Sequence, residues 1–419
     1  MQKKQHKILA WVLNACVLIP PIFYFSIVNT YALNIPYSDD YDAILAFLNK
    51  FVSSGSTEKV ALLFSQHNEH RILFSRIIFV LYYEAVGAIS FRNLIFIGNI
   101  ELAGVFIIII YFIRKAIPGY WNIAAIILSL CLFDLSNFEN SGSAMAGVQN
   151  YGVILLFLLG ILFYSLKSNQ YLVPAFLFQA LIVFSSGNGM IGSLCMLFFT
   201  ILLKDKPRII ISGACLIIFA PLYFLHYNKT GTAPVNTLAE YSTYFIRHAG
   251  AVFNFKYSFY LGICLLIILA VSLPVTKKLR LAENTAPFLS LLLFILISIA
   301  AIAYFRSSLK GINFYTSRYL VYPHLLAAIV FIFAYIKLRA EKIRLVISLA
   351  FIVAMVLVNV QNSRWGEMGL KIAYTRLTNY PFVYPDKERA KQLSDESCRL
   401  KIYCIEKHRE SDLHFIFDK

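Results

Sequence analysis

Three carboxylates lie within four residues in the segment Tyr37-Ser38-Asp39-Asp40-Tyr41-Asp42. The segment directly follows a long apolar run, and ionised groups are costly to hold close to hydrocarbon. One carboxylate of such a cluster can act as a general base on an acceptor hydroxyl, and a neighbour can raise its pKa toward the useful range. The sequence therefore predicts a catalytic pair, Asp40 first and Asp39 second. The alternative is structural: Ser38 or Asp39 caps a helix that begins near Asp42.

A second polar cluster, Gln66-His67-Asn68-Glu69-His70-Arg71, ends the same extramembrane segment. If this stretch is helical, His67, His70 and Arg71 share one face. That face could bind a phosphate, with Arg71 as the bidentate donor, or a divalent metal through two imidazoles and an acidic residue. A polar belt at the lipid head-group level is the plain alternative, although such belts more typically use Trp, Tyr and Lys.

Polar residues also interrupt apolar segments further along the chain. Glu139-Asn140 and Gln149-Asn150 flank a stretch of small residues, and Ser185-Ser186-Gly187-Asn188-Gly189 breaks a long apolar run. Such patterns indicate backbone that leaves helical geometry, which is tolerated at membrane depth only where it lines protein or a cavity. Ser317-Arg318-Tyr319 suits a lipid phosphate or a sugar, with a snorkelling anchor as the alternative.

The elements that must position these residues are membrane helices. Hydrophobic residues make up 59% of the 419 residues and charged residues only 14%, whereas a soluble domain has about one-quarter charged residues. Many apolar runs approach the ~20 residues that cross a bilayer, and a helix satisfies its own backbone there. The expected fold is all-α, a bundle of about 11–13 membrane segments, with apolar helices near residues 8–30, 72–90, 93–113, 120–135, 150–166, 171–186, 190–203, 208–225, 257–275, 285–304, 319–337 and 343–360.

The net charge of +16 is not distributed like that of a nucleic-acid-binding protein. Basic residues gather in short hinges between apolar segments, which is the positive-inside pattern of membrane proteins. These hinges and the N-terminus are therefore expected to face the cytoplasm. The clusters are Arg114-Lys115, Lys167, Lys204/Lys206/Arg208, Lys277/Lys278/Arg280 and Lys337/Arg339/Lys342/Arg344.

The hinge charges alternate cleanly only if residues 72–113 make an odd number of crossings. The segment 72–90 carries Arg76 and Glu84 and is expected to be re-entrant or interfacial. The chain then divides into a membrane domain, residues 1–360 with a first outer loop at 31–71, and an extracytoplasmic region, residues 361–419. Cys398 and Cys404 in that region could form a disulfide if it is periplasmic, and the sequence leaves this open.

With these motifs in place, the layout resembles the GT-C superfamily of integral membrane glycosyltransferases. More narrowly, the Gln66–Arg71 string, Glu139-Asn140 with Gln149, the Ser-Gly-Asn-Gly turn at 186–189 and Ser317-Arg318-Tyr319 are similar to a widespread group of bacterial membrane proteins. Size and the expected outside C-terminus are also similar to the serotype-converting glucosyltransferases that modify the O-antigen of lipopolysaccharide. The resemblance covers the layout of most of residues 1–340.

The resemblance implies an inverting hexosyltransferase that moves one sugar from a polyprenyl-phosphate donor to a hydroxyl of a cell-surface glycan. Asp40 or Asp39 would be the base, and Arg71, Arg318 and His70 would neutralise the departing lipid phosphate. No cofactor is expected, and a metal is not required where arginine supplies the counter-charge. The remaining polar residues of the motifs would contact substrate: His67, Glu69, Glu139, Asn140, Gln149, Asn188 and Tyr319.

Two other functions fit a many-span protein of this composition. An O-antigen polymerase or ligase also joins lipid-linked sugars outside the cell, but relies on outer-loop Arg and His. A lipid-linked glycan flippase or transporter predicts charged residues at mid-membrane and inverted repeats. Few charges lie at mid-depth here and no repeat is visible in the sequence, so this function is the less favoured of the two.

Overall fold

A computed structural model describes residues 2–228, 237–253, 256–273, 284–306, 316–338 and 340–405. Within these ranges the chain is helical apart from turns and one two-stranded antiparallel hairpin, β1 (Gln66–His67) with β2 (His70–Arg71). The predicted all-α membrane bundle is therefore confirmed.

Among the described residues, eight helical segments are long and apolar enough to cross a membrane. They are α1 (Gln2–Tyr31), α5 (Phe91–Ala116), α6 (Trp121–Leu132) continued by α7 (Phe138–Gly142), α8 (Ala144–Ser165), α11 (Lys206–Phe224), α14 (Ala286–Arg306), α15 (Val321–Lys337) with the 3-10 turn η6 (Ser317–Tyr319), and α16 (Glu341–Asn379). Three shorter apolar segments are the 3-10 turn η3 (Asn169–Tyr171) with α9 (Leu172–Val183), α10 (Gly187–Leu203) and α13 (Ser258–Ser272).

The segment expected to be re-entrant or interfacial forms α4 (Leu73–Val86), which is not among these apolar spans. It ends at Gly87, whose φ of +80° is the left-handed conformation that terminates many helices. The side chain of Arg76 is buried and donates to the carbonyls of Leu62 (2.6 Å) and Ser65 (2.5 Å). The arginine that disfavours a crossing thus anchors α4 to the preceding helix, α3 (Ser56–Phe64).

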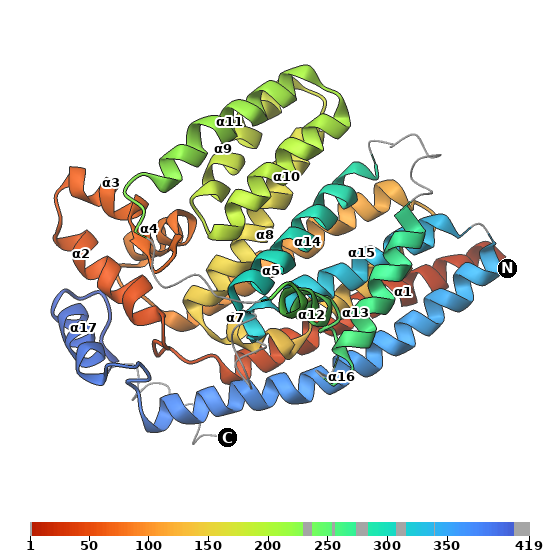
Figure 1. Ribbon diagram of the computed structural model, residues 1–419. Helices are drawn as coiled ribbons and strands as arrows, with labels where there is room; N and C mark the ends of the chain where they lie inside the picture. Colours follow the sequence, from red (N-terminus) through yellow and green to blue (C-terminus); the bar gives the residue numbers. More distant parts are fainter. Residues whose placement is uncertain are drawn as a thin grey trace.

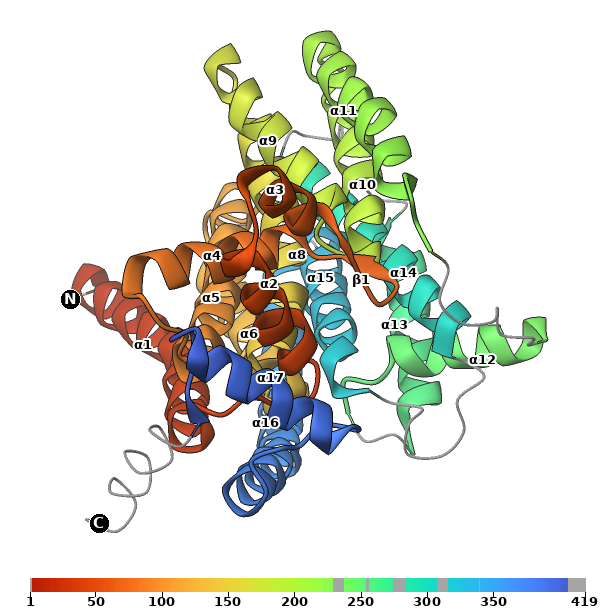
Figure 2. The ribbon, with the colours of Figure 1, turned by 90° about the vertical axis from the view of Figure 1, so that its left-hand side faces the viewer.

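The small helices gather at one end of the bundle. Figure 1 shows α2 (Phe47–Ser53), α3, α4 and α17 (Lys387–Arg399) together at the end opposite the N-terminal end of α1, and Figure 2 views the bundle from that side. The other short elements are the π-helix η1 (Tyr41–Ala46), the 3-10 turn η2 (Leu135–Asn137) and α12 (Leu238–Ala249).

The basic hinges meet at the N-terminal end of the bundle. Lys115, Lys167, Arg208 and Asn284, from four different hinges, line one cavity of about 350 Å³. Lys337 Nζ, at the end of α15, donates to the carbonyl of Val271 on α13 at 2.6 Å. Hinge residues that are far apart in sequence therefore lie close together around this cavity.

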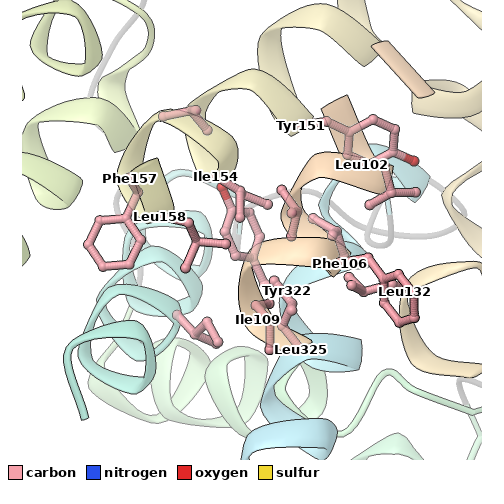
Figure 3. Close-up of a cluster of buried hydrophobic side chains, with 14 of the residues drawn as sticks. Leu102, Phe106, Ile109, Leu132, Tyr151, Ile154, Phe157, Leu158, Tyr322 and Leu325 are labelled. Carbon is pink, nitrogen blue, oxygen red and sulfur yellow. The ribbon is translucent and has the colours of Figure 1, made fainter. Parts of the chain in front are cut away.

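The centre of the bundle is an apolar core shared by α5, α6, α8 and α15 (Figure 3). Small residues let the backbones approach closely. At Gly98 on α5, an added Cβ would lie 2.8 Å from the backbone of Gly147 on α8, and at Gly366 on α16 it would lie 1.9 Å from the carbonyl of Leu135. This packing through small residues is the usual means by which membrane helices associate, and it holds α16 against the turn that precedes α7.

The C-terminal region is attached to the bundle and to the first loop. α16 is continuous through residue 360, the expected boundary, and ends at Asn379. Cys398 and Cys404, whose pairing the sequence left open, form a disulfide. Beyond α17, Tyr403 donates its hydroxyl to the carbonyl of Asn34 at 2.7 Å. Residues 406–419 of the expected extracytoplasmic region lie outside the described residues.

Candidate functional site

A turn of unusual backbone conformation directly precedes the adjacent aspartates Asp39 and Asp40 of the first loop. Ser38 has a φ of +50°, in the left-handed region that non-glycine residues rarely adopt. Its backbone N–H donates to the carbonyl of Val383 in the C-terminal region at 3.0 Å, so a tertiary contact holds the turn. Strain of this kind clusters at functional sites. Here it precedes two carboxylates with different surroundings, Asp39 and Asp40.

Asp40 is directed into the protein and is only 1% exposed. One carboxylate oxygen accepts from the backbone N–H of Met145 at 2.8 Å and the other from that of Tyr37 at 3.0 Å. Met145 lies in the first turn of α8, where unpaired N–H groups and the helix dipole favour a negative charge. The Asp40 carboxylate therefore caps α8, which is distant in sequence. The helix that begins beside it, η1 (Tyr41–Ala46), has Asp40 and not Ser38 or Asp39 at its N-cap position, and no side chain caps it.

Burial raises the pKa of Asp40 from 3.8 to about 7, partly offset by the two backbone hydrogen bonds. Between these pH values the folded protein holds a proton that the unfolded chain has released. Stability from this group therefore falls as pH rises from about 4 to about 7.

We expect Asp40→Asn to remove this dependence. The difference in stability between wild type and variant should decline across that pH window, by at most about 4 kcal/mol. Thermal unfolding in detergent at several pH values measures it, because the difference cancels the titration of the other groups. Parallel stability curves would contradict the burial of an ionisable Asp40.

Asp39 points instead toward a partly exposed ion-pair cluster. Its carboxylate lies 3.4 Å from Arg318 Nη1, and Arg318 Nε lies 3.1 Å from the carboxylate of Glu139. The exposed fractions of the Asp39, Arg318 and Glu139 side chains are 38, 32 and 31%. One guanidinium thus bridges two carboxylates that a ligand can reach from solvent.

A set of hydrogen bonds holds this cluster on three elements. The backbone N–H of Glu139, in α7, donates to Ser317 Oγ at 2.9 Å, and the Arg318 N–H donates to the Glu139 carboxylate at 3.3 Å. Asn140 Nδ2 donates to the Arg318 carbonyl at 2.8 Å, and Asn150 on α8 donates to Asn140 Oδ1 at 2.9 Å. Asn140 therefore positions the turn that carries Arg318. Its predicted companion Gln149 is buried one residue before Asn150.

The His-rich stretch is a β-hairpin, not the helix considered from the sequence. The face that would have combined His67, His70 and Arg71 therefore does not form. Burial lowers the pKa of both histidines, which favours neutral rings. His70 lies against the start of α10, since a Cβ added at Gly187 would be 3.1 Å from its Nδ1, and Glu69 is exposed at the hairpin turn. Within the described parts of the chain, no three His, Cys, Asp or Glu side chains are grouped so as to hold a metal ion.

The guanidinium of Arg71 is occupied by backbone carbonyls. Nε donates to Tyr223 at 2.7 Å, and the two terminal nitrogens donate to Phe64 and Leu225. The side chain is only 8% exposed. Arg71 thus ties the hairpin to the carbonyls that end α11, and this geometry favours a structural role over the phosphate-binding role expected from the sequence.

We therefore expect Arg71→Gln to destabilise the fold. A glutamine leaves two of the three carbonyls without their donor, at about 1–3 kcal/mol each. The melting temperature in detergent should fall by several degrees, and Arg71→Lys should recover only part of the loss. If Arg71→Gln kept the stability of the wild type but lost sugar transfer, Arg71 would instead have the phosphate-binding role expected from the sequence.

The structure adds an arginine that the sequence reading missed. Arg306, at the end of α14, donates to the hydroxyl of Tyr319 at 3.2 Å and lies over its ring. It ends an apolar span on the side away from the basic hinges, which is a usable signal because it departs from the positive-inside pattern. Nearby, Asn188 Nδ2 donates to the hydroxyl of Tyr322 at 2.8 Å. The segment 186–189, expected to be a turn, is the N-cap and first turn of α10, and this bond fastens it to α15.

A buried polar network lies beside the 3-10 turn η6, which carries Arg318. Asp134 and His324 are both fully buried, with 3.5 Å between Asp134 Oδ1 and His324 Nε2. Asn362 on α16 donates to Asp134 Oδ2 at 3.0 Å. His324 Nδ1 lies 2.7 Å from the carbonyl of Leu320, one residue after η6. Because a carbonyl only accepts, this nitrogen carries the proton.

The predicted residues Asp39, Asp40, Glu139, Asn140, Arg318 and Tyr319 thus come together at one end of the bundle, whereas Arg71 serves the hairpin. Comparison with solved structures finds chains of similar fold. The apo crystal structure of ArnT from Cupriavidus metallidurans aligns over 88% of this chain and 76% of its own, with a TM-score of 0.44 and 14% identity. A likeness at this level assigns neither family nor activity. No protein-family model and no curated protein matches the chain.

Proposed function

We propose that this chain is a membrane glycosyltransferase of the GT-C type. It would transfer a single sugar, a hexose by the resemblance, from a polyprenyl-phosphate donor to a hydroxyl of a cell-surface glycan such as O-antigen. The observation that carries the proposal is the partly exposed Asp39–Arg318–Glu139 cluster at one end of an apolar helical bundle. It combines a carboxylate suited to proton abstraction with a cation suited to a phosphate.

The reaction is an inverting displacement at the anomeric carbon. The acceptor oxygen attacks this carbon and transfers its proton to the Asp39 carboxylate. The bond from the anomeric carbon to the phosphate oxygen breaks, and its electron pair remains on the lipid phosphate. Arg318 neutralises the charge that develops there, and Arg306, which contacts the neighbouring Tyr319, adds a second cation.

Accessibility favours Asp39 over Asp40 as the base, which reverses the order expected from the sequence. A pKa of about 7 would suit Asp40 for proton abstraction at neutral pH. However, its carboxylate is buried and both oxygens accept backbone N–H groups. A base must lie within hydrogen-bond reach of the hydroxyl that it deprotonates, and geometry takes precedence over pKa.

We propose that this end of the bundle faces the periplasm and that the N-terminus and hinges face the cytoplasm. The meeting of basic hinge residues at the other end supports this orientation. The Cys398–Cys404 disulfide also supports it, because such bonds persist in oxidising compartments. The C-terminal region would then be periplasmic, and the protein multi-pass in the inner membrane.

The donor decides between the proposed transferase and an O-antigen polymerase or ligase. Protein reconstituted in proteoliposomes is given either a polyprenyl-phosphate monosaccharide or a polyprenyl-diphosphate oligosaccharide, with a glycan acceptor. The proposal expects release of polyprenyl monophosphate from the first donor. Release of polyprenyl diphosphate from the second donor alone would instead identify a polymerase or ligase.

A further inference from the structure

We propose that the C-terminal region forms an acceptor subsite for a saccharide that carries an acidic group, a carboxylate or a phosphate. The inference rests on the proposed transferase function and names the class of its acceptor. It arises from a surface hollow of about 470 Å³ between the first loop and the segment that follows α16. The wall that follows α16 was assigned no role from the sequence motifs.

The hollow adjoins the candidate site directly. Tyr37 and Ser38 line it, and the next residue along the chain is Asp39. Burial raises the pKa of the Tyr37 hydroxyl, and both Arg376 and Arg318 act on it in the opposite sense. Tyr37 therefore lies within electrostatic reach of the arginine of the hollow and of the arginine of the ion-pair cluster. A sugar in the hollow can present a hydroxyl toward Asp39.

Aromatic side chains form much of the lining. Tyr380, Phe382 and Tyr384 face the hollow together with Tyr37. Aromatic rings offer apolar faces, and tyrosines add a polar hydroxyl, a combination that suits the apolar C–H faces and hydroxyls of a sugar.

The wall is braced from behind, so that its shape is fixed before a ligand binds. The hydroxyl of Tyr41 donates to the carbonyl of Pro381 at 2.7 Å, and the rings of Tyr41 and Tyr384 lie 5.5 Å apart. Tyr384 also donates its hydroxyl to the carboxylate of Asp42, which pairs with Arg389 at 2.7 Å. Preorganised binding residues lose less conformational entropy when a ligand binds.

Two cations give the hollow its charge preference. Arg376 and Lys387 both line it and are exposed, and neither has an ion-pair partner among the described residues. Asp386, which directly precedes Lys387, instead accepts the backbone N–H of Arg389 at the start of α17. A guanidinium matches the geometry of a carboxylate or phosphate. An acidic sugar would therefore complete interactions that the protein leaves open.

The test compares trigalacturonate with its neutral trimethyl ester, which has nearly the same shape without the charge. Binding of both to the full chain in zwitterionic nanodiscs is measured by microscale thermophoresis. We expect wild type to prefer the acid at least about 10-fold, and R376Q/K387Q to lose this preference. The matched control K371Q/K391Q removes the same charge from exposed lysines outside the hollow and should retain it.

Equal binding of acid and ester by wild type would overturn the proposal. It would also be overturned if R376Q/K387Q and K371Q/K391Q lost the preference for the acid to the same extent. A third result would overturn it in favour of a lipid head-group site. Nanodiscs that contain phosphatidylglycerol would then weaken binding of the acid to the wild type and to K371Q/K391Q, but would have no such effect on R376Q/K387Q. If wild type binds the acid but turns over no polyprenyl-phosphate sugar in proteoliposomes, the proposed transferase function is wrong. The hollow would then still stand as a site for acidic sugars.

Discussion

Replacing Asp39 with Asn is expected to lower the rate of sugar transfer by about 10²- to 10⁴-fold, the range for loss of a general base. The amide keeps the size of the side chain but cannot take the proton of the acceptor hydroxyl. Because the Asp39 side chain is 38% exposed and makes one long contact with Arg318, the fold should tolerate the change. Transfer is measured as released polyprenyl phosphate in proteoliposomes.

Two neighbouring aspartates serve as controls for this substitution. Asp42→Asn removes a carboxylate that pairs with Arg389 and Tyr384 outside the cluster, and should reduce transfer far less. Asp40→Asn should act chiefly on stability, because its carboxylate caps α8. A loss of turnover in well-folded Asp40→Asn, with Asp39→Asn active, would return the role of base to Asp40.

Replacing Arg318 with Gln is expected to lower transfer by about 10²- to 10³-fold, the cost typical of removing one group that stabilises charge in a transition state. The effect should fall mainly on kcat, because the negative charge on the leaving phosphate grows as the bond breaks. Arg318→Lys should recover part of the rate, since it keeps the charge but loses the fork geometry.

A structural explanation for the loss at Arg318 can be separated by a double variant. Arg318→Gln alone leaves the carboxylates of Asp39 and Glu139 without the cation that bridges them. Adding Glu139→Gln relieves that repulsion. If the double variant regains most of the wild-type rate, Arg318 acts only as a counter-charge for the protein's own acids, and its proposed role toward the lipid phosphate is wrong.

The sequence predicted the parts of the fold that depend on simple physical rules. Long apolar runs marked the spans, and the charged residues of the segment 72–90 correctly set α4 apart from the apolar spans. Arg76 explains that exception, because its side chain is held by carbonyls of the preceding helix. The length of an apolar run and the basic residues of a hinge are properties of short, continuous segments, so both can be recognised in the sequence.

Roles that depend on tertiary contacts could not be read in this way. A six-residue polar stretch carries no periodicity, so the hairpin at 66–71 could be taken for a helix. From the sequence, Arg71 was expected to bind a phosphate. The carbonyls that it contacts in the structure, those of Tyr223 and Leu225 at the end of α11, are distant in sequence and could not be foreseen. Likewise, the burial of Asp40 depends on the distant backbone N–H of Met145, and the hollow is made by a C-terminal region that carries no known motif.

The central claim is that this protein adds a sugar to a surface glycan with Asp39 as the base. It is tested most directly by mass spectrometry of surface glycans from a deletion strain complemented with wild type, Asp39→Asn or Asp42→Asn at equal protein levels. We predict that the deletion strain and the Asp39→Asn strain lack one sugar substituent that wild type and Asp42→Asn restore. Identical glycans in the deletion strain and its parent, or full restoration by Asp39→Asn, would contradict it.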